Sequence, residues 1–230
     1  DSGRIDKRLI AELGFGNSKV FSTTFVEQYN DAILHISVDA SGSMGGDKWT
    51  NTMTAVVAIC KAASMISGLD VVVSFRTTHY ASGRSGQPLV AIGFDSRVDK
   101  FRKIENIWPS LHPGGTTPEG LCYEAIMKDF VGGTNNRDSY FLNFSDGQPM
   151  FSGDGFEYYG DSALHHTRKQ VKEIVKKGIS VMSYFVGDSD YDRSRNMDDF
   201  KTMYGKDAEF IDVTKVSSLA KTMNNLFLEK

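Results

Sequence analysis

Apolar runs of strand length alternate with helical patterns along most of this chain, and that alternation constrains the fold more than any other feature. The predicted strands are residues 32–39, 69–75, 89–94, 139–145, 179–186 and 208–213. The predicted helices are residues 48–67, 117–130, 162–177, 195–204 and 215–228. Strands that alternate with helices in this way build a parallel sheet that is covered on both faces.

One pair of strands departs from the parallel pattern. The connection 79–87, rich in Gly and Ser, is too short for a crossover helix. Strands 69–75 and 89–94 are therefore expected to form an antiparallel hairpin at one edge of the sheet. We predict a doubly wound α/β fold, with a mostly parallel central sheet, one antiparallel edge strand and helices on both faces.

The length of 230 residues suits one large α/β domain, which we place at residues 32–230. Residues 1–31 precede the alternation and are too few for a domain of their own. They are interpreted as an N-terminal extension packed on the domain, with a short helix at 6–13 and a strand at 20–26.

A cluster of oxygen-bearing side chains stands where the first strand of the alternation ends. The chain there reads Asp39-Ala40-Ser41-Gly42-Ser43. Alternate residues of an extended chain point the same way, so one carboxylate and two hydroxyls are expected to converge. Oxygen donors without nitrogen or sulfur suit a hard cation such as Mg²⁺. Asp and Ser also favour turns and helix N-caps, so this pentapeptide alone is equally compatible with a turn that enters a helix.

Two further segments favour the metal site. The loop 112–120 (HPGGTTPEG) opens the helix 117–130, and the strand 139–145 runs into Asp146-Gly147. In an open α/β sheet such loops gather at the carboxyl ends of the strands, where ligands bind. They add a threonine hydroxyl and a second carboxylate to the cluster.

These three elements, in this order, resemble the metal-ion-dependent adhesion site of the von Willebrand factor A family, and the resemblance covers about residues 30–228. It implies a Rossmann-like fold and one Mg²⁺ or Mn²⁺ ion at a site without catalytic residues. The ligands that it implies are Asp39, Ser41, Ser43, Thr116 and Asp146. Because the Gly-Gly-Thr-Thr-Pro loop is about one residue short of the family's commonest spacing, either Thr116 or Thr117 could face the ion. Thr117 is also a good N-cap for the helix, so Thr116 is favoured.

Several looser features resemble one branch of that family, the C-terminal domain of the cobaltochelatase T subunit and its relatives paired with MoxR-type AAA+ ATPases. They are the stretches 2–9 (SGRIDKRL), 30–33 (NDAI) and 158–168 (YYGDSALHHTR). The branch implies a subunit of a chelatase-like or MoxR-associated complex. In such a module a partner's Asp or Glu replaces a metal-bound water, with residues such as Met44, Asp47 and Gln148 forming the rim that selects the partner.

Enzymatic alternatives find little support in the motifs. Ser43 lacks the glycine two residues earlier that a nucleophile elbow needs, and no Ser/His/Asp set is evident. No phosphate-binding loop of the Gly-x-x-x-x-Gly-Lys-Ser/Thr type occurs. We therefore expect a non-catalytic interaction module. The alternatives are a Mg²⁺-dependent hydrolase or phosphatase and a scaffold whose metal is purely structural.

Charge and composition limit the classes of partner and the cellular compartment that are expected. The net charge of −3, without a basic cluster, gives no case for nucleic acid. No apolar run approaches the roughly 18 residues of a spanning helix, so no membrane partner is expected. Cys60 and Cys122 both fall in helical patterns, and two cysteines are few for a disulfide framework. Reduced thiols and a cytoplasmic location are the resulting expectation.

Overall fold

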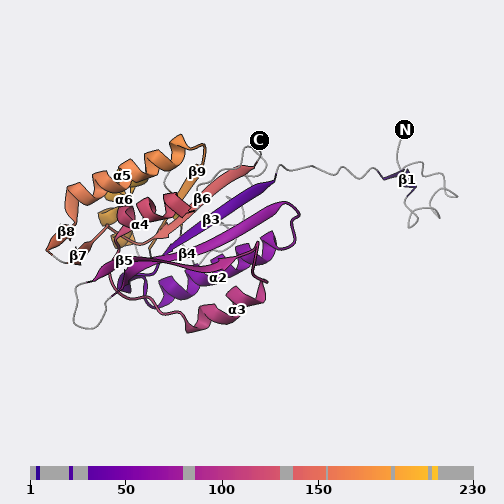
Figure 1. The fold of residues 1–230 in the computed structure, drawn as a ribbon, viewed down its shortest axis with the longest axis horizontal. Helices are drawn as coiled ribbons and strands as arrows, with labels where there is room; N and C mark the ends of the chain where they lie inside the picture. Colours follow the sequence, from indigo (N-terminus) through magenta and orange to yellow (C-terminus); the bar gives the residue numbers. More distant parts are fainter. Residues whose placement is uncertain are drawn as a thin grey trace.

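The computed structural model describes residues 4–5, 21–22, 31–79, 86–129, 137–153, 155–187, 190–206 and 209–211. Its main body is a six-stranded sheet in the order β10-β9-β6-β3-β4-β5, with helices on both faces (Figure 1). Neighbouring strands are parallel except β4 and β5, which pair antiparallel and leave β5 at the edge. This architecture confirms the predicted fold class.

The strands of this sheet are β3 (Ala32–Asp39), β4 (Leu69–His79), β5 (Gln87–Asp95), β6 (Asp138–Ser145), β9 (Ser180–Val186) and β10 (Glu209–Ile211). The helices are η1 (Gly42–Met44), α2 (Asp47–Ala63), α3 (Arg102–Ile107), η2 (Trp108–Ser110), α4 (Glu119–Asp129), α5 (Gly160–Lys176) and α6 (Asp190–Tyr204). Two small antiparallel sheets pair β1 (Arg4–Ile5) with β2 (Phe21–Ser22) and β7 (Phe151–Gly153) with β8 (Phe156–Tyr158).

The main differences from the predicted elements lie at the ends of helices, in the end of β4 at His79 rather than at residue 75, and in short elements. Helix α2 ends at Ala63 rather than at residue 67, and α6 begins at Asp190 rather than at 195. Helix α3 and the hairpin β7–β8 were not predicted, because each is too short to show a periodicity. The predicted helices 6–13 and 215–228 lie outside the described residues. The packing of the N-terminal extension on the domain stays a prediction.

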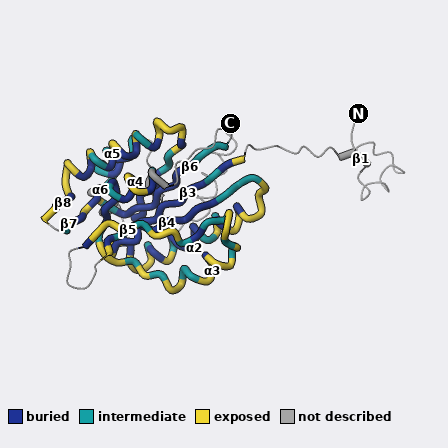
Figure 2. The backbone as a smooth tube through the Cα atoms, viewed as in Figure 1, coloured by how far each residue is buried: buried dark blue, intermediate teal, exposed yellow. Residues whose placement is uncertain are grey.

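The two faces of the sheet are built differently. On the face covered by α2 and α3, alternate strand residues such as Leu34, Ile36 and Val38 are fully buried and join one apolar core with Met53 of α2 (Figures 1 and 2). Helices α4 and α5 cover the other face, where a smaller apolar cluster includes Phe141 of β6. Both faces are thus buried, as the continuous apolar runs of the strands predict.

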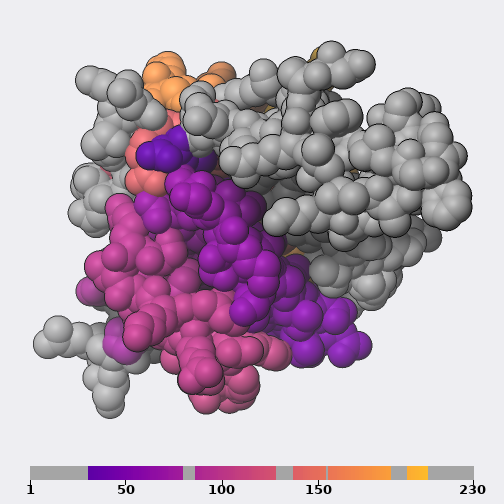
Figure 3. Space-filling model, turned by 90° about the vertical axis from the view of Figure 1, so that its right-hand side faces the viewer, coloured from indigo at the N-terminus to yellow at the C-terminus, as the bar shows by residue number. Residues whose placement is uncertain are grey.

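Buried polar side chains are concentrated on the face under α4. They occupy alternate positions of the central strands, and most lie in the carboxyl-terminal halves: Ser37 and Asp39 of β3, Ser74, Arg76 and Thr78 of β4, and Asn143 and Ser145 of β6. The opposite end of the sheet, where the parallel strands begin, carries the connection from α2 to β4 and the segment around α3 on its described surface (Figure 3). The candidate site therefore has to be sought at the carboxyl ends of the strands.

None of the helices in the described ranges combines the length and the hydropathy of a membrane span.

Candidate metal centre

The Asp-x-Ser-x-Ser motif lies where β3 leaves the sheet. Asp39, the last residue of β3, is fully buried, and its Oδ1 accepts a hydrogen bond of 2.9 Å from the backbone N–H of Ser41. The chain then turns into η1, and the Oγ atoms of Ser41 and Ser43 lie 3.0 Å apart. Two hydroxyls of the motif are therefore in direct contact beside the buried carboxylate.

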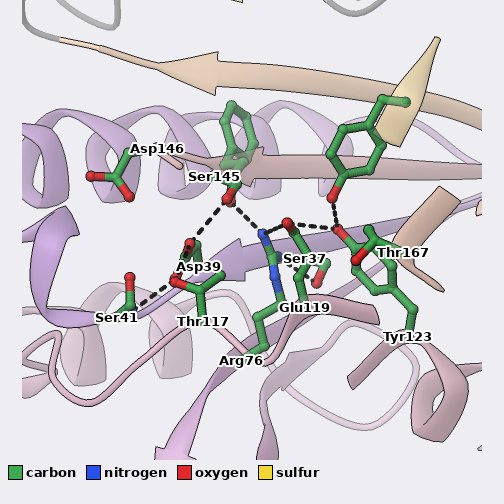
Figure 4. A network of polar contacts seen from close by, with 12 residues as sticks. Ser37, Asp39, Ser41, Arg76, Thr117, Glu119, Tyr123, Ser145, Asp146 and Thr167 are labelled. Atoms are coloured by element: carbon green, nitrogen blue, oxygen red, sulfur yellow. Dashed lines mark hydrogen bonds and ion pairs between the residues drawn. The ribbon is translucent and has the colours of Figure 1, made fainter. Parts of the chain in front are cut away.

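Asp146 joins this cluster from the neighbouring strand. It follows Ser145, the last residue of β6, and its Oδ1 accepts a hydrogen bond of 2.8 Å from the Ser43 hydroxyl. Its Oδ2 accepts a hydrogen bond of 2.9 Å from the ammonium of Lys48, in the first turn of α2. Figure 4 shows Asp39, Ser41 and Asp146 around one region at the ends of the strands. Oxygen donors from two strands thus meet, as the sequence predicts for loops at one sheet edge.

The threonine beside the cluster is Thr117 rather than Thr116. The Thr117 hydroxyl donates to Asp39 Oδ2 at 3.3 Å, whereas the Thr116 hydroxyl lies 2.5 Å from that of Thr78 on β4. Thr117 was expected to cap the helix, and this expectation was wrong because α4 begins at Glu119. The main chain of Thr117 instead forms a bridge with Met150. Thr117 therefore takes the place that the sequence analysis gave to Thr116.

Glycines hold this threonine loop against the end of β3. Gly114 donates its backbone N–H to the carbonyl of Ala40 at 2.8 Å, and the carbonyl of Gly115 accepts from Gly42 at 3.1 Å. Gly115 has a φ of +77°, and a Cβ there would lie 2.8 Å from the Thr78 carbonyl oxygen. Only glycine allows both this backbone conformation and this close approach. The Gly-Gly pair of the motif thus positions the threonine.

A buried ion pair that sequence reasoning missed lies under the cluster. Arg76 of β4 is the register partner of Asp39, and its guanidinium contacts Glu119 Oε1 at 2.7 Å, with both side chains fully buried. Arg76 also donates to the Ser37 hydroxyl at 3.0 Å, and the Tyr123 hydroxyl donates to Glu119 at 3.1 Å (Figure 4). The sequence did offer one signal. Arg76 directly follows the predicted strand 69–75, at a position that faces the same side of the sheet as Asp39.

The three residues expected to form the rim differ in their exposure to solvent. Met44 is fully buried in the core under α2 and cannot contact a partner. Asp47 and Gln148 are exposed, and the Gln148 amide donates to the carboxylate of Asp199 on α6. The rim prediction therefore fails for Met44, because η1 turns that side chain into the core, and it stays open for the other two.

Burial raises the pKa of both acidic groups at the site. For Asp39 burial is the largest effect, and the charge of Arg76 opposes it by lowering the pKa. For Asp146 burial also dominates, the charge of Asp39 raises the pKa further, and Lys48 lowers it. Two desolvated carboxylates that repel each other are costly to ionise. A cation bound between them would relieve that cost.

The donor set fits a small, hard dication. The contacts Ser41 Oγ–Ser43 Oγ at 3.0 Å and Ser43 Oγ–Asp146 Oδ1 at 2.8 Å match the spacing of about 3 Å between neighbouring ligands of octahedral Mg²⁺. Within the described residues no group of three or more His, Cys, Asp or Glu side chains gathers as a metal site, so this candidate depends on hydroxyl donors beside its two carboxylates. The residues that would hold the ion are Asp39, Ser41, Ser43, Thr117 and Asp146.

Comparisons with known proteins support the fold. No family model matches the chain. A curated relative, the uncharacterized protein YojO of Bacillus subtilis, is 25% identical over 216 residues, which cover 91% of this chain and 32% of that protein. The chain thus spans about a third of the length of the curated relative that it matches.

Two solved structures carry the same architecture. The von Willebrand factor domain of the type V pilus tip protein Mfa5 from Porphyromonas gingivalis has a TM-score of 0.59 at 9% identity, over 86% of this chain and 96% of that chain. Proximal thread matrix protein 1 from the mussel byssus, with a zinc-occupied MIDAS motif, has a TM-score of 0.53 at 14% identity, over 86% and 45%. The chain therefore has the von Willebrand factor A fold.

Proposed function

We propose that this domain is a metal-dependent protein-interaction module that binds a carboxylate of a partner through a divalent cation, Mg²⁺ or Mn²⁺. The observation that carries the proposal is the contact of Ser41, Ser43 and Asp146 oxygens at the carboxyl end of the sheet. When bound, the ion supplies a coordination position that an Asp or Glu of another protein can occupy.

The residues of this chain would keep such an ion open to an anion. The three hydroxyl ligands are neutral, and Asp39 already accepts hydrogen bonds from Ser41, Ser145 and Thr117. Those hydrogen bonds orient the buried carboxylate of Asp39 and reduce the negative charge that it presents to a bound metal. A dication with few anionic ligands stays electron-poor and favours a further carboxylate.

A non-catalytic role agrees with the contacts of Ser43. Its hydroxyl donates to a carboxylate that also holds an ammonium, which is not the arrangement of a nucleophile activated by histidine. The buried His35 bonds to Ser74, and His166 bonds to Tyr158, both away from this cluster. Two solved structures of similar fold are, by their names, a pilus tip protein and a thread matrix protein of the mussel byssus. No observation favours the hydrolase or the scaffold alternative.

For the partner we propose a MoxR-type AAA+ ATPase, with the domain acting as a subunit of a cobaltochelatase-like or MoxR-associated complex in the cytoplasm. Support comes from the branch features at 2–9, 30–33 and 158–168. The last of these runs from the end of β8 into α5, and the Tyr158 hydroxyl lies 3.1 Å from that of Thr167 in α5. Both cysteines are free and buried, in agreement with a reducing compartment.

Affinity capture from the source cell tests this proposal. The bait is the domain in Mg²⁺ or in EDTA, beside the double variant Ser41→Ala with Ser43→Ala. A matched double variant, Ser64→Ala with Ser162→Ala, removes two exposed hydroxyls that bond only to nearby carbonyls. We expect an AAA+ ATPase to be captured by the wild type and the matched variant in Mg²⁺, and by neither the site variant nor the EDTA sample.

Two results would contradict the proposal. Capture of the same partner by the site variant in EDTA would exclude a metal-mediated contact, provided that the circular dichroism spectrum of the variant is unchanged. Metal-dependent capture of a protein that is not an ATPase would keep the interaction module and overturn the proposed partner.

A further inference from the structure

Lys48 occupies an unusual position for a cation. It lies in the first turn of α2, where the helix dipole disfavours positive charge. Its ammonium nevertheless lies 2.9 Å from Asp146 Oδ2, with only 13% of the Lys48 side chain and 2% of the Asp146 side chain exposed. The charge of Asp146 therefore holds a largely buried lysine at the end of the helix that is least favourable to it.

Both oxygens of Asp146 are engaged. Oδ1 accepts from Ser43, which belongs to the metal-binding motif, and Oδ2 accepts from Lys48. The ammonium is thus bound to a carboxylate that the proposed function assigns to the ion. A unit positive charge a few ångströms from a dication weakens metal binding, and it also strengthens the attraction of an anion to the loaded site.

The charges at the site give this lysine a defined role. Arg76 and Glu119 form a fully buried ion pair, and their charges cancel. Among the described residues, Asp39, Asp146 and Lys48 then sum to one negative charge, and a bound dication would raise this sum to one positive charge. Replacing Lys48 by an uncharged residue lowers the total charge of the site by one unit, whatever other groups face it. Asp47, the residue before it, is exposed and is screened by water.

We infer that Lys48 determines partner specificity: it makes the metal-loaded site more positive by one unit of charge, and so favours an anionic group of the partner at the expense of metal affinity. This inference rests on the proposed function and names the feature that makes the loaded site select a single carboxylate. The lysine acts by its charge, so arginine can replace it and an uncharged side chain cannot.

The experiment measures metal affinity and anion binding separately. Isothermal titration with Mn²⁺ compares the metal-free wild type with Lys48→Met, Lys48→Gln and Lys48→Arg. Broadening of the acetate methyl proton resonance by the Mn²⁺-loaded proteins then reports carboxylate binding, with acetamide as the neutral probe. Lys61→Met is the matched control, because it removes a lysine from the same helix about 20 Å away.

We expect the two uncharged variants to bind Mn²⁺ on the order of tenfold more tightly and to broaden acetate several-fold less. Lys48→Arg and Lys61→Met should match the wild type, and acetamide should be unaffected throughout. Unchanged Mn²⁺ affinity or unchanged acetate broadening in both uncharged variants would overturn the role assigned to Lys48 and would leave the proposed function untouched. Failure of the wild type to bind Mn²⁺ would overturn the proposed function, and this inference with it.

Discussion

The two faces of the central sheet use the same strands for opposite purposes. Under α2, Leu34, Ile36 and Val38 of β3 lie in a continuous apolar core. On the other side of the same strand, Ser37 and Asp39 are equally buried but polar, and they contact the charged network around the candidate site. One strand thus supplies hydrophobic stabilisation on one face and the chemistry of the site on the other, because successive side chains alternate.

The polar face is also the less completely satisfied one. Within the described residues, Asn143 Nδ2 and Oδ1, Arg76 Nε, Glu119 Oε2 and Ser183 Oγ have no protein hydrogen-bond partner. A buried polar atom without a partner costs about 1–3 kcal/mol. We conclude that the apolar face supplies most of the stability, and that the polar face carries the cost of holding buried charges where a cation can be bound.

The largest expected effect comes from breaking the buried ion pair on the polar face. Arg76→Met leaves Glu119 charged and without its cation, so the free energy of unfolding should fall by about 3–5 kcal/mol in urea denaturation. The double variant Arg76→Met with Glu119→Gln should regain much of the loss. Arg137→Met, which removes the half-buried partner of Asp70, should cost about 1 kcal/mol or less. Equal losses for Arg76→Met and Arg137→Met would contradict this view of the polar face.

A cavity on the apolar face should reduce stability without affecting the site. Ile36→Ala removes a fully buried side chain and should cost about 2–4 kcal/mol. The folded variant should bind Mn²⁺ with the affinity of the wild type, measured by titration below its denaturation temperature. A clear change in Mn²⁺ affinity would show that the two faces are not independent.

The two neighbouring threonines provide a matched test of the geometry. Thr117→Val should weaken Mn²⁺ binding on the order of tenfold, about 1.4 kcal/mol, because its hydroxyl lies on Asp39. Thr116→Val should leave the affinity close to that of the wild type, because its hydroxyl contacts Thr78. The reverse ranking in titration calorimetry would restore Thr116 as the ligand.

The smallest predicted effect is a pH dependence of metal stabilisation. Burial raises the pKa of Asp39 and Asp146 above the ordinary 3.8, so the metal-free folded protein retains these protons to higher pH than the unfolded chain. Metal-free stability therefore falls as pH rises from that value through the raised ones, whereas the loaded site keeps ionised carboxylates. The gain in stability from Mg²⁺ should therefore be larger at pH 7.5 than at pH 5, measured by thermal unfolding with Mg²⁺ and with EDTA. A larger gain in stability from Mg²⁺ at pH 5 would contradict the raised pKa values of Asp39 and Asp146.

The sequence predicted what periodicity and local motifs determine. Strand β3 has its predicted bounds, and the antiparallel hairpin of β4 with β5 follows from a connection too short for a helix. Asp39 and Asp146 could be recognised as a pair because the carboxyl ends of parallel strands share one edge of the sheet. These features depend on residues close together in the chain or on a general rule of topology.

The features that the sequence did not predict depend on tertiary contacts. The apolar run that predicts this strand ends at residue 75, yet β4 continues to His79 and Arg76 pairs with Glu119 across the fold. The helix start moves to Glu119 because Thr117 pairs with Met150, which lies far away in the chain. Local propensity favoured Thr117 as a cap, and a long-range contact overrode it.

Titration of the metal-free domain with Mg²⁺ and Mn²⁺ tests the central claim most directly. We predict one ion for each chain, with binding abolished by Asp39→Ala and by Asp146→Ala and retained by Asp47→Ala, the exposed carboxylate nearest in sequence. Circular dichroism of each variant confirms that it is folded. Unchanged binding in both site variants, or no binding by the wild type, would contradict a metal centre at the carboxyl ends of β3 and β6.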